Sequence, residues 1–190
     1  MKKALYLVIV LFFFSSIGYA ETTEAYHNDK FKFSLNIPAE FKTTPSSAPF
    51  SLAAYTNEKV YIQLRYIDPQ GNYSGPTFGA ITKKELENFI KRQRLVAALN
   101  MSKFKFSNYD THVTADGFPY VWAMFISNIQ INEDNFRTYM LHNYFLNKDI
   151  IIELNFIIPE EDFVNSSTMI SDIISSFKFD NHPSYNAPFQ

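Results

Sequence analysis

Apolar and polar residues alternate with a period of two in several separate stretches of the chain. The odd positions are apolar in FKFSLNI (31–37), and the even positions are apolar or aromatic in VYIQLRY (60–66). A period of two places successive side chains on opposite faces of a β-strand, so each stretch predicts a half-buried strand. Pro38 ends the first strand because proline cannot donate a ladder hydrogen bond. Further strands are expected over residues 50–55, after Lys103, over 136–146 and, briefly, over 177–179.

Two stretches are apolar on both faces. They are YVWAMFISNIQI (120–131), mainly in its first half, and IIIELNFII (150–158). A strand with two apolar faces is usually central in a sheet and covered on both sides. Trp122, the only tryptophan, lies in the first stretch. The pattern therefore predicts that Trp122 is buried in a central strand.

Two other segments have the apolar spacing of amphipathic helices. The first is TKKELENFIKRQRLVAALN (82–100), in which Thr82 is followed three residues later by Glu85, as a capping box requires. The second runs over residues 160–176, and its acidic first turn complements the helix dipole. The positions expected to be buried are Leu86, Phe89, Ile90, Val96 and Ala97 in the first helix, and Phe163, Ile170, Ile173, Ile174 and Phe177 in the second.

The order of these elements predicts an α+β fold. Consecutive strands joined by short turns pair antiparallel, and the two helices then cover the two faces of the sheet. The expected architecture is an α–β–α sandwich around a mainly antiparallel sheet of about six or seven strands. It forms a single domain over residues 21–180, which opens with a short, loose, polar lead-in (21–28) and is followed by a mobile tail (181–190) rich in proline and polar residues.

The first twenty residues have the three parts of a secretory signal peptide. Lys2 and Lys3 precede an apolar run over residues 5–14, and the segment ends in Gly18-Tyr19-Ala20. The alternative is a membrane anchor, but the run is shorter than the roughly 20 apolar residues that span a bilayer. We therefore expect cleavage after Ala20 and a periplasmic or secreted protein, with no integral membrane segment in the mature chain.

Composition and charge narrow the classes of partner. Cleavage would remove two lysines and no acid, which moves the formal charge from −2 to −4. A surface of that sign does not favour nucleic acid, whose binding depends on basic contacts to phosphates. The chain has no cysteine, which excludes disulfides, thiolate nucleophiles and cysteine metal sites. Aromatic residues make up 17% of the chain, a content typical of a packed domain and not of disorder.

No motif in the sequence predicts catalysis, a metal or a cofactor. The four histidines (His27, His112, His142 and His182) lack ligand spacing such as H-E-x-x-H, so they are interpreted as isolated surface residues, although a metal site assembled in space stays open. Ser175 and Lys178 match S-x-x-K, but the S-D-N and K-T-G elements that accompany that motif are missing. We therefore expect no catalytic residue, no metal ligand and no cofactor.

Three segments resemble the PsbP-like family. They are FKFSLNIPAEFK (31–42), a first strand closed by proline and an aromatic; DGFPYVWAMF (116–125), a turn into a long central strand; and SDIISSFKF (171–179), a final helix that runs into a closing strand. The fold of that family is shared with a eukaryotic protein that binds the Ran GTPase. The resemblance implies an exported, bacterial-type, non-enzymatic domain that binds or assists larger protein assemblies.

Three hypotheses for function follow. The first is an exported accessory domain that acts through protein–protein contacts with an envelope or extracellular partner. The second is a small-ligand carrier with an aromatic cleft between the sheet and a helix, and the third is a hydrolase of unfamiliar type. A deep polar cleft with clustered acids or histidines would favour the third.

A long loop over residues 68–80 is the predicted partner site. It contains three glycines and two prolines, and it exceeds the roughly 4–6 residues of a typical connection. Tyr73 and Phe78 are its predicted contact residues, because aromatic side chains are enriched at interface hot spots. The alternative is that Phe78 packs under the following helix and the rest of the loop is a linker. Tyr73, which has no apolar neighbour in sequence, separates the two interpretations.

Overall fold

The computed structural model describes residues 23–100, 104–131 and 134–180. The signal-peptide and tail predictions fall on residues outside these ranges. The strands are β1 (Thr23–Asn28), β2 (Phe33–Pro38), β3 (Lys42–Thr43), β4 (Ser51–Thr56), β5 (Tyr61–Ile67), β6 (Phe104–Val113), β7 (Pro119–Ile131), β8 (Asp134–Asn147), β9 (Ile150–Pro159) and β10 (Lys178–Phe179); the helices are α2 (Lys83–Asn100) and α3 (Glu160–Ser175).

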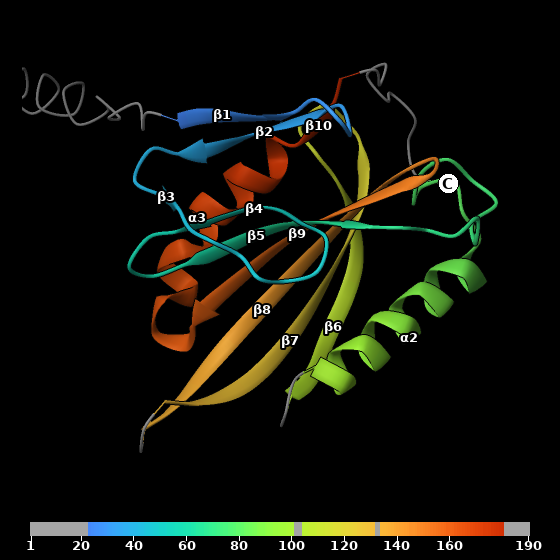
Figure 1. Ribbon diagram of the computed structural model, residues 1–190. Coiled ribbons are helices and arrows are strands. Elements are labelled where there is room, and N and C mark those ends of the chain that lie inside the picture. The colour runs from blue at the N-terminus through green and yellow to red at the C-terminus, as the bar shows by residue number, and fades with distance from the viewer. Residues whose placement is uncertain (1–22, 101–103, 132–133, 181–190) are drawn as a thin grey trace, which may run out of the picture.

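The strands form two sheets. The larger has seven strands in the order β3-β4-β5-β9-β8-β7-β6, and the smaller has the order β1-β2-β10. Every neighbouring pair is antiparallel. The helices lie on opposite sides of the larger sheet (Figure 1). The predicted α+β sandwich is confirmed, with the first predicted strand placed in the separate smaller sheet.

Each face of the larger sheet has its own apolar core. On β9, Ile152, Leu154 and Phe156 pack beneath α3, whereas Ile151 lies on the α2 side. This division follows from strand alternation, because successive residues point to opposite faces. The two runs that the sequence predicts as apolar on both faces, in β7 and β9, therefore supply side chains to both cores.

The prediction that residues 21–28 form a loose lead-in is wrong for Thr23–Asn28, which form β1. The segment TEAYHN is polar by composition, yet it pairs along its full length with β2. Tyr26 supplies the apolar contact, since its ring lies 5.8 Å from that of Phe33 and 6.2 Å from that of Tyr55. One large side chain and the ladder of backbone hydrogen bonds are enough to hold an edge strand whose other residues face water.

The predicted capping box is confirmed at the start of α2. The backbone N–H of Thr82 donates to Oε2 of Glu85 at 2.8 Å, and the N–H of Glu85 donates to Oγ1 of Thr82 at 3.3 Å. The backbone and hydroxyl of Ser74 also donate to the same carboxylate. Hydrogen bonds from Thr82 and Ser74 lower the pKa of Glu85 to about 2. The cap therefore fixes the helix start and ties the middle of the 68–80 loop, at Ser74, to the first turn of α2.

Removing the capping hydroxyl is expected to weaken α2 measurably. Thr82→Ala leaves the N–H of Glu85 without its acceptor and should lower the free energy of unfolding by about 1 kcal/mol, as N-cap truncations commonly do. Thr82→Ser keeps the hydroxyl and is the matched control. Urea denaturation of both variants measures the difference, and equal stability of Thr82→Ala and wild type would contradict the role of the cap.

The prediction that Trp122 is buried is wrong, and so is the same prediction for Val96. Leu86 and Phe163, also expected to be buried, are half-buried at the borders of the two cores. Trp122 is half-buried, because β7 lies beside the edge strand β6 while α3 packs over β8, β9 and β2. Val96 is 44% exposed. It lies at the mouth of a cavity that separates the end of α2 from the sheet, so the sheet does not cover it.

Trp122 should therefore contribute less to stability than a core ring. We expect Trp122→Ala to cost about 1–2 kcal/mol, below the roughly 3–5 kcal/mol of a fully buried aromatic truncation. Phe125→Ala on the same strand is the matched comparison, since Phe125 is buried. Urea denaturation gives both values. A Trp122→Ala cost as large as that of Phe125→Ala would contradict the half-buried placement.

Candidate ligand site between α2 and the sheet

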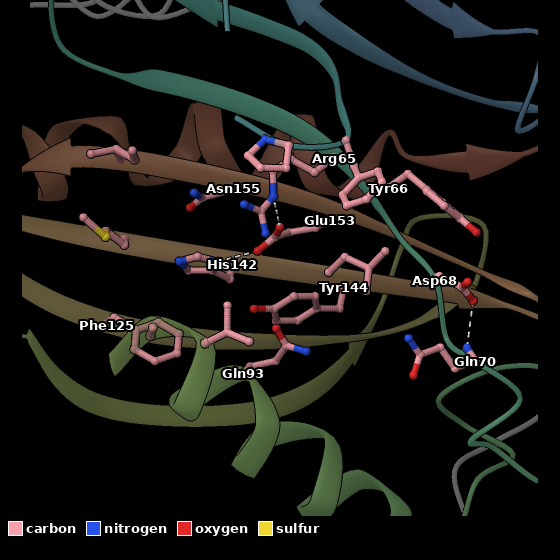
Figure 2. Close-up of a pocket in the computed structure, with 17 residues that line it drawn as sticks. Arg65, Tyr66, Asp68, Gln70, Gln93, Phe125, His142, Tyr144, Glu153 and Asn155 are labelled. Atoms are coloured by element: carbon pink, nitrogen blue, oxygen red, sulfur yellow. Dashed lines mark hydrogen bonds and ion pairs between the residues drawn. The ribbon is translucent and has the colours of Figure 1, made fainter. Parts of the chain in front are cut away.

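A cavity of about 750 Å³ lies between α2 and the larger sheet. Its floor comes from β5, β7, β8 and β9, and its roof comes from Gln93, Val96 and Ala97 of α2 (Figure 2). The size falls within the range of roughly 300–1,000 Å³ that is typical of small-molecule sites. The remaining lining residues are Pro49, Phe50, Arg65, Tyr66, Ile67, Asp68, Gln70, Phe125, Met140, His142, Tyr144, Glu153, Asn155 and Ile157.

Three charged or titratable side chains meet at the floor of this cavity. Glu153 of β9 is 1% exposed, and its carboxylate joins Arg65 to His142 (Figure 2). Nε of Arg65 lies 2.6 Å from Oε2 of Glu153, and Nδ1 of His142 lies 2.6 Å from Oε1. Sheet register creates the cluster, because Arg65 is directly opposite Glu153 and His142 is directly opposite Asn155, two residues further along β9.

The electrostatics of the cluster keep Glu153 ionised. Burial acts to raise the pKa of its carboxyl, but the hydrogen bond and charge of His142, together with Arg65, outweigh burial and hold the pKa below its ordinary value. Neighbouring Tyr144 has the opposite shift. Burial, and next the negative charge of Glu153, raise the pKa of its phenol well above the usual range. The site therefore holds a carboxylate beside a neutral phenol at neutral pH.

Two polar atoms at the cavity floor have no hydrogen-bond partner among the described residues. An ionised carboxylate only accepts hydrogen bonds, so Nδ1 of His142 carries the proton that it shares with Glu153. The other ring nitrogen, Nε2, is buried without a partner, and so is Oδ1 of Asn155. Buried polar atoms are normally paired, so two unpaired atoms lining one cavity indicate groups that a bound molecule would satisfy.

The lining contains part of a nucleophile-activating arrangement. A histidine held by a carboxylate is half of a nucleophile-activating arrangement, which also needs a hydroxyl or thiol within hydrogen-bond reach. The described lining residues include no serine, threonine or cysteine, and their hydroxyls are the phenols of Tyr66 and Tyr144. Within the described ranges, no group of three histidines, aspartates or glutamates is placed to hold a metal ion.

The two sequence-predicted site residues, Tyr73 and Phe78, do not line this cavity, and their rings pack from the 68–80 loop against the α2 core. Phe78 is 4% exposed and its ring lies 5.0 Å from that of Phe89 on α2. Tyr73 has polar neighbours in sequence, but in the structure its ring lies 6.2 Å from that of Phe78 and 6.1 Å from that of Phe89. Both rings contribute to the α2 core. Partner binding by this loop stays a prediction. A contact between Phe78 and a partner would require its ring to leave the core.

Sequence reasoning missed the cluster because it took His142 for an isolated surface residue. Eleven positions separate His142 from Glu153 in the sequence, and only the β8–β9 hairpin brings them together. A signal was present, however. Glu153 is the only charged residue in the apolar run 150–158, and a charge in a strand covered on both faces needs a buried partner.

Comparison with known proteins finds likeness in structure and none in sequence. No family model matches the chain, and no curated protein matches it. The solution structure of cyanobacterial PsbP (CyanoP) from Synechocystis sp. PCC 6803 is 12% identical with a TM-score of 0.60; the match covers 86% of this chain and 95% of CyanoP. The Ran-binding protein Mog1p of Saccharomyces cerevisiae is 8% identical with a TM-score of 0.48, covering 85% and 97%. A point mutant of Mog1 is 9% identical with a TM-score of 0.50, covering 83% and 96%.

These likenesses confirm the resemblance inferred from the sequence at the level of fold. The chain has the fold of PsbP and Mog1, and identities of this size carry the fold alone. Neither described helix combines the length and apolar character needed to cross a membrane.

Proposed function

We propose that this chain is an exported, non-catalytic binding domain that holds a small, mostly apolar molecule with one polar end in the cavity beneath α2. The observation that carries the proposal is the Arg65–Glu153–His142 cluster at the floor of a cavity of about 750 Å³. Phe125, Met140 and Ile157 give the cavity its apolar walls. The polar end of the ligand would pair with Nε2 of His142 or Oδ1 of Asn155, which lack partners in the described chain.

The cluster is better explained by binding than by stability. Burying ionised groups costs desolvation energy that their mutual attraction often fails to repay, and apolar replacements are commonly as stable. Most other buried side chains of the sheet are apolar and the remaining ones are uncharged, so packing there does not need a carboxylate. Ligand binding would explain why these charges are buried, whereas packing alone does not.

A larger side chain on α2 would block the cavity without changing the cluster. Ala97 is buried and lines the cavity, whereas Ala98, the next residue of α2, is exposed. Ala97→Phe should fill part of the space and reduce affinity for the apolar dye N-phenylnaphthylamine at least about tenfold, while Ala98→Phe should change it less than about twofold. Dye fluorescence gives the affinities, and circular dichroism verifies folding. Equal dye affinity in both folded variants would overturn the proposal.

Native mass spectrometry extends the test to the natural ligand. Protein purified from the exporting cell without denaturation should carry an additional mass that Ala97→Phe lacks and Ala98→Phe retains. A bound mass of the same size in both variants would place the ligand outside this cavity and contradict the proposal.

Protein–protein contact is the second candidate function. Its supporting observation is the exposed apolar surface of α2, where Leu95 is 58% and Leu99 86% exposed, together with Phe50, 74% exposed at the cavity mouth. Exposed apolar residues that cluster on one element commonly mark interaction sites. Leu99→Asp should then abolish capture of an envelope protein in a cross-linking pull-down, while Leu99→Met should retain it. Capture that survives Leu99→Asp would remove this surface as the partner site.

Cleavage of the signal peptide can be measured directly. We expect the mature protein to begin at Glu21, because Gly18-Tyr19-Ala20 follows the apolar run with small residues at the two positions that signal peptidase reads. Intact-mass analysis of the protein from the envelope or medium decides the matter. A mature form that still contains Met1–Ala20 would contradict cleavage.

A further inference from the structure

A second cavity, of about 420 Å³, lies on the opposite face of the sheet between α3 and the β6–β7 edge. Three aromatic rings form its outer wall. The ring of His112 lies 6.2 Å from that of Trp122 at an interplanar angle of 24°, and 6.0 Å from that of Tyr120 at 33°. Register aligns them, because His112 of β6 is directly opposite Tyr120 of β7, and Asp110 is directly opposite Trp122. α3 packs over β8 and β9, which leaves this strip of rings half-exposed or exposed.

A buried acceptor without a partner lies at the inner end of this groove. Asn143 of β8 is 1% exposed and lines the cavity. Its Nδ2 donates to the backbone oxygen of Leu154 at 3.1 Å, which fixes the orientation of the amide. Its Oδ1 is buried and has no partner among the described residues. A ligand that enters the groove would therefore be held best by an O–H or N–H donor directed at this oxygen.

The charges around the groove favour a neutral ligand. No lysine, arginine, aspartate or glutamate is among the described residues that line it. The polar groups of its lining are the hydroxyls of Tyr120, Ser167 and Ser171, the imidazole of His112 and the amide of Asn143. The exposed carboxylate of Asp110 lies 3.8 Å from Nε2 of His112. A phosphate or carboxylate ligand would find no lysine or arginine there, whereas a molecule with several hydroxyl groups would find both donors and acceptors among these side chains.

We propose that this groove binds a neutral pyranose sugar. A pyranose has a flat face of C–H bonds, which stacks on an aromatic ring, and an edge of hydroxyl groups, each of which donates and accepts hydrogen bonds. The face of the sugar would lie on Trp122 and His112, and one hydroxyl would donate to Oδ1 of Asn143. This inference is independent of the cavity beneath α2, because the two sites lie on opposite faces of the sheet and share no lining residue.

Trp122 is the only tryptophan of the chain, so its fluorescence reports directly on this groove. Titration of the full mature chain with maltose, cellobiose or N,N′-diacetylchitobiose should give a saturable change in Trp122 emission. Sorbitol has the hydroxyl groups without the ring and should give none. Absence of a response to all three disaccharides would overturn the proposal. An equal response to sorbitol would also overturn it. A synthetic peptide of residues 181–190 tests whether the chain's own tail is the ligand, and saturation by this peptide alone would likewise contradict sugar binding.

Two variants separate sugar binding from a structural effect. Asn143→Leu removes both the unpaired Oδ1 acceptor and the Nδ2 donor to Leu154, and it substitutes an apolar side chain of similar volume. The protein should stay folded with a modestly lower melting temperature, while sugar affinity falls at least about tenfold. His112→Ala should lower affinity by a similar factor, and His27→Ala, at an exposed histidine outside the groove, should leave it unchanged. Unchanged affinity in a folded Asn143→Leu protein would place any sugar elsewhere and overturn the site.

Discussion

Replacing Glu153 by glutamine is expected to lower the free energy of unfolding by about 3 kcal/mol, the lower end of the range for breaking a buried ion pair. Glutamine has nearly the shape of glutamate, so the loss comes from the charge and not from packing. Arg65 and the proton-bearing Nδ1 of His142 would then face an amide in place of a carboxylate. Both partners retain some exposure, 28% for Arg65 and 15% for His142, and water can therefore compensate part of the loss.

The dependence of stability on pH provides an independent measurement. The surroundings of Glu153 lower its pKa in the folded protein below the ordinary 4.5. A group whose pKa is lowered by folding stabilises the protein above the unfolded pKa and loses that contribution as the pH falls through the folded pKa. Urea denaturation at pH 7 and at about pH 4 should therefore show a larger loss for wild type than for Glu153→Gln. Parallel loss in both proteins would contradict an ionised Glu153.

An exposed ion pair supplies the matched control. Arg137 and Glu160 lie 3.0 Å apart and are both nearly half-exposed. Water screens such a pair, so Glu160→Gln should change stability by less than about 1 kcal/mol. If Glu160→Gln lowered the free energy of unfolding as much as Glu153→Gln, burial of the cluster would not be the cause of the large loss expected for Glu153→Gln.

An apolar replacement of the whole cluster separates stability from binding. The triple variant Arg65→Met, His142→Leu and Glu153→Leu removes every charge of the cluster. It leaves the buried phenol of Tyr144 without its hydrogen bond to Glu153, so it should recover part, and not all, of the stability that Glu153→Gln loses. If the cluster serves the ligand, the natural ligand observed by native mass spectrometry should nevertheless be lost. Retention of that ligand by the triple variant would contradict a role for the cluster in binding.

The strands and helices could be predicted from the sequence because their burial is periodic. Alternation in FKFSLNI and VYIQLRY follows directly from side chains that face one core and water in turn. The start of α2 was predictable for a different reason, because capping is local: Thr82 and Glu85 are three residues apart and need no other part of the chain to pair. β1 was missed because a polar edge strand with one half-buried ring, that of Tyr26, has no such period.

The candidate site could not be predicted in the same way, because it depends on register. Arg65, His142 and Glu153 come from three strands, and a shift of one residue in either pairing would turn one of them to the opposite face. The sequence does show that Glu153 interrupts an apolar run. What it does not show is which residue pairs with Glu153. Two strands border β9, so the search for that partner would be confined to β5 and β8 once their order is known.

Phe177→Ala is expected to cost about 4–5 kcal/mol, the upper part of the range for aromatic core truncation. Phe177 is fully buried where α3 ends and the smaller sheet meets the larger. Its ring stacks on Phe145 of β8 at 3.8 Å and on Phe33 of β2 at 5.3 Å, and it meets Phe179 of β10 edge-on at 5.2 Å.

Because Phe177 joins the two sheets, its removal should loosen β1, β2 and β10 before the rest of the domain. Truncation leaves a cavity bordered by rings from both sheets, and the short β10 is held to β2 by only two residue pairs. Hydrogen exchange should therefore accelerate in the smaller sheet of Phe177→Ala, while Phe50→Ala, at a 74% exposed ring, should change stability by less than about 0.5 kcal/mol. Uniform acceleration across both sheets would show that the ring supports the domain as a whole and does not join its two parts.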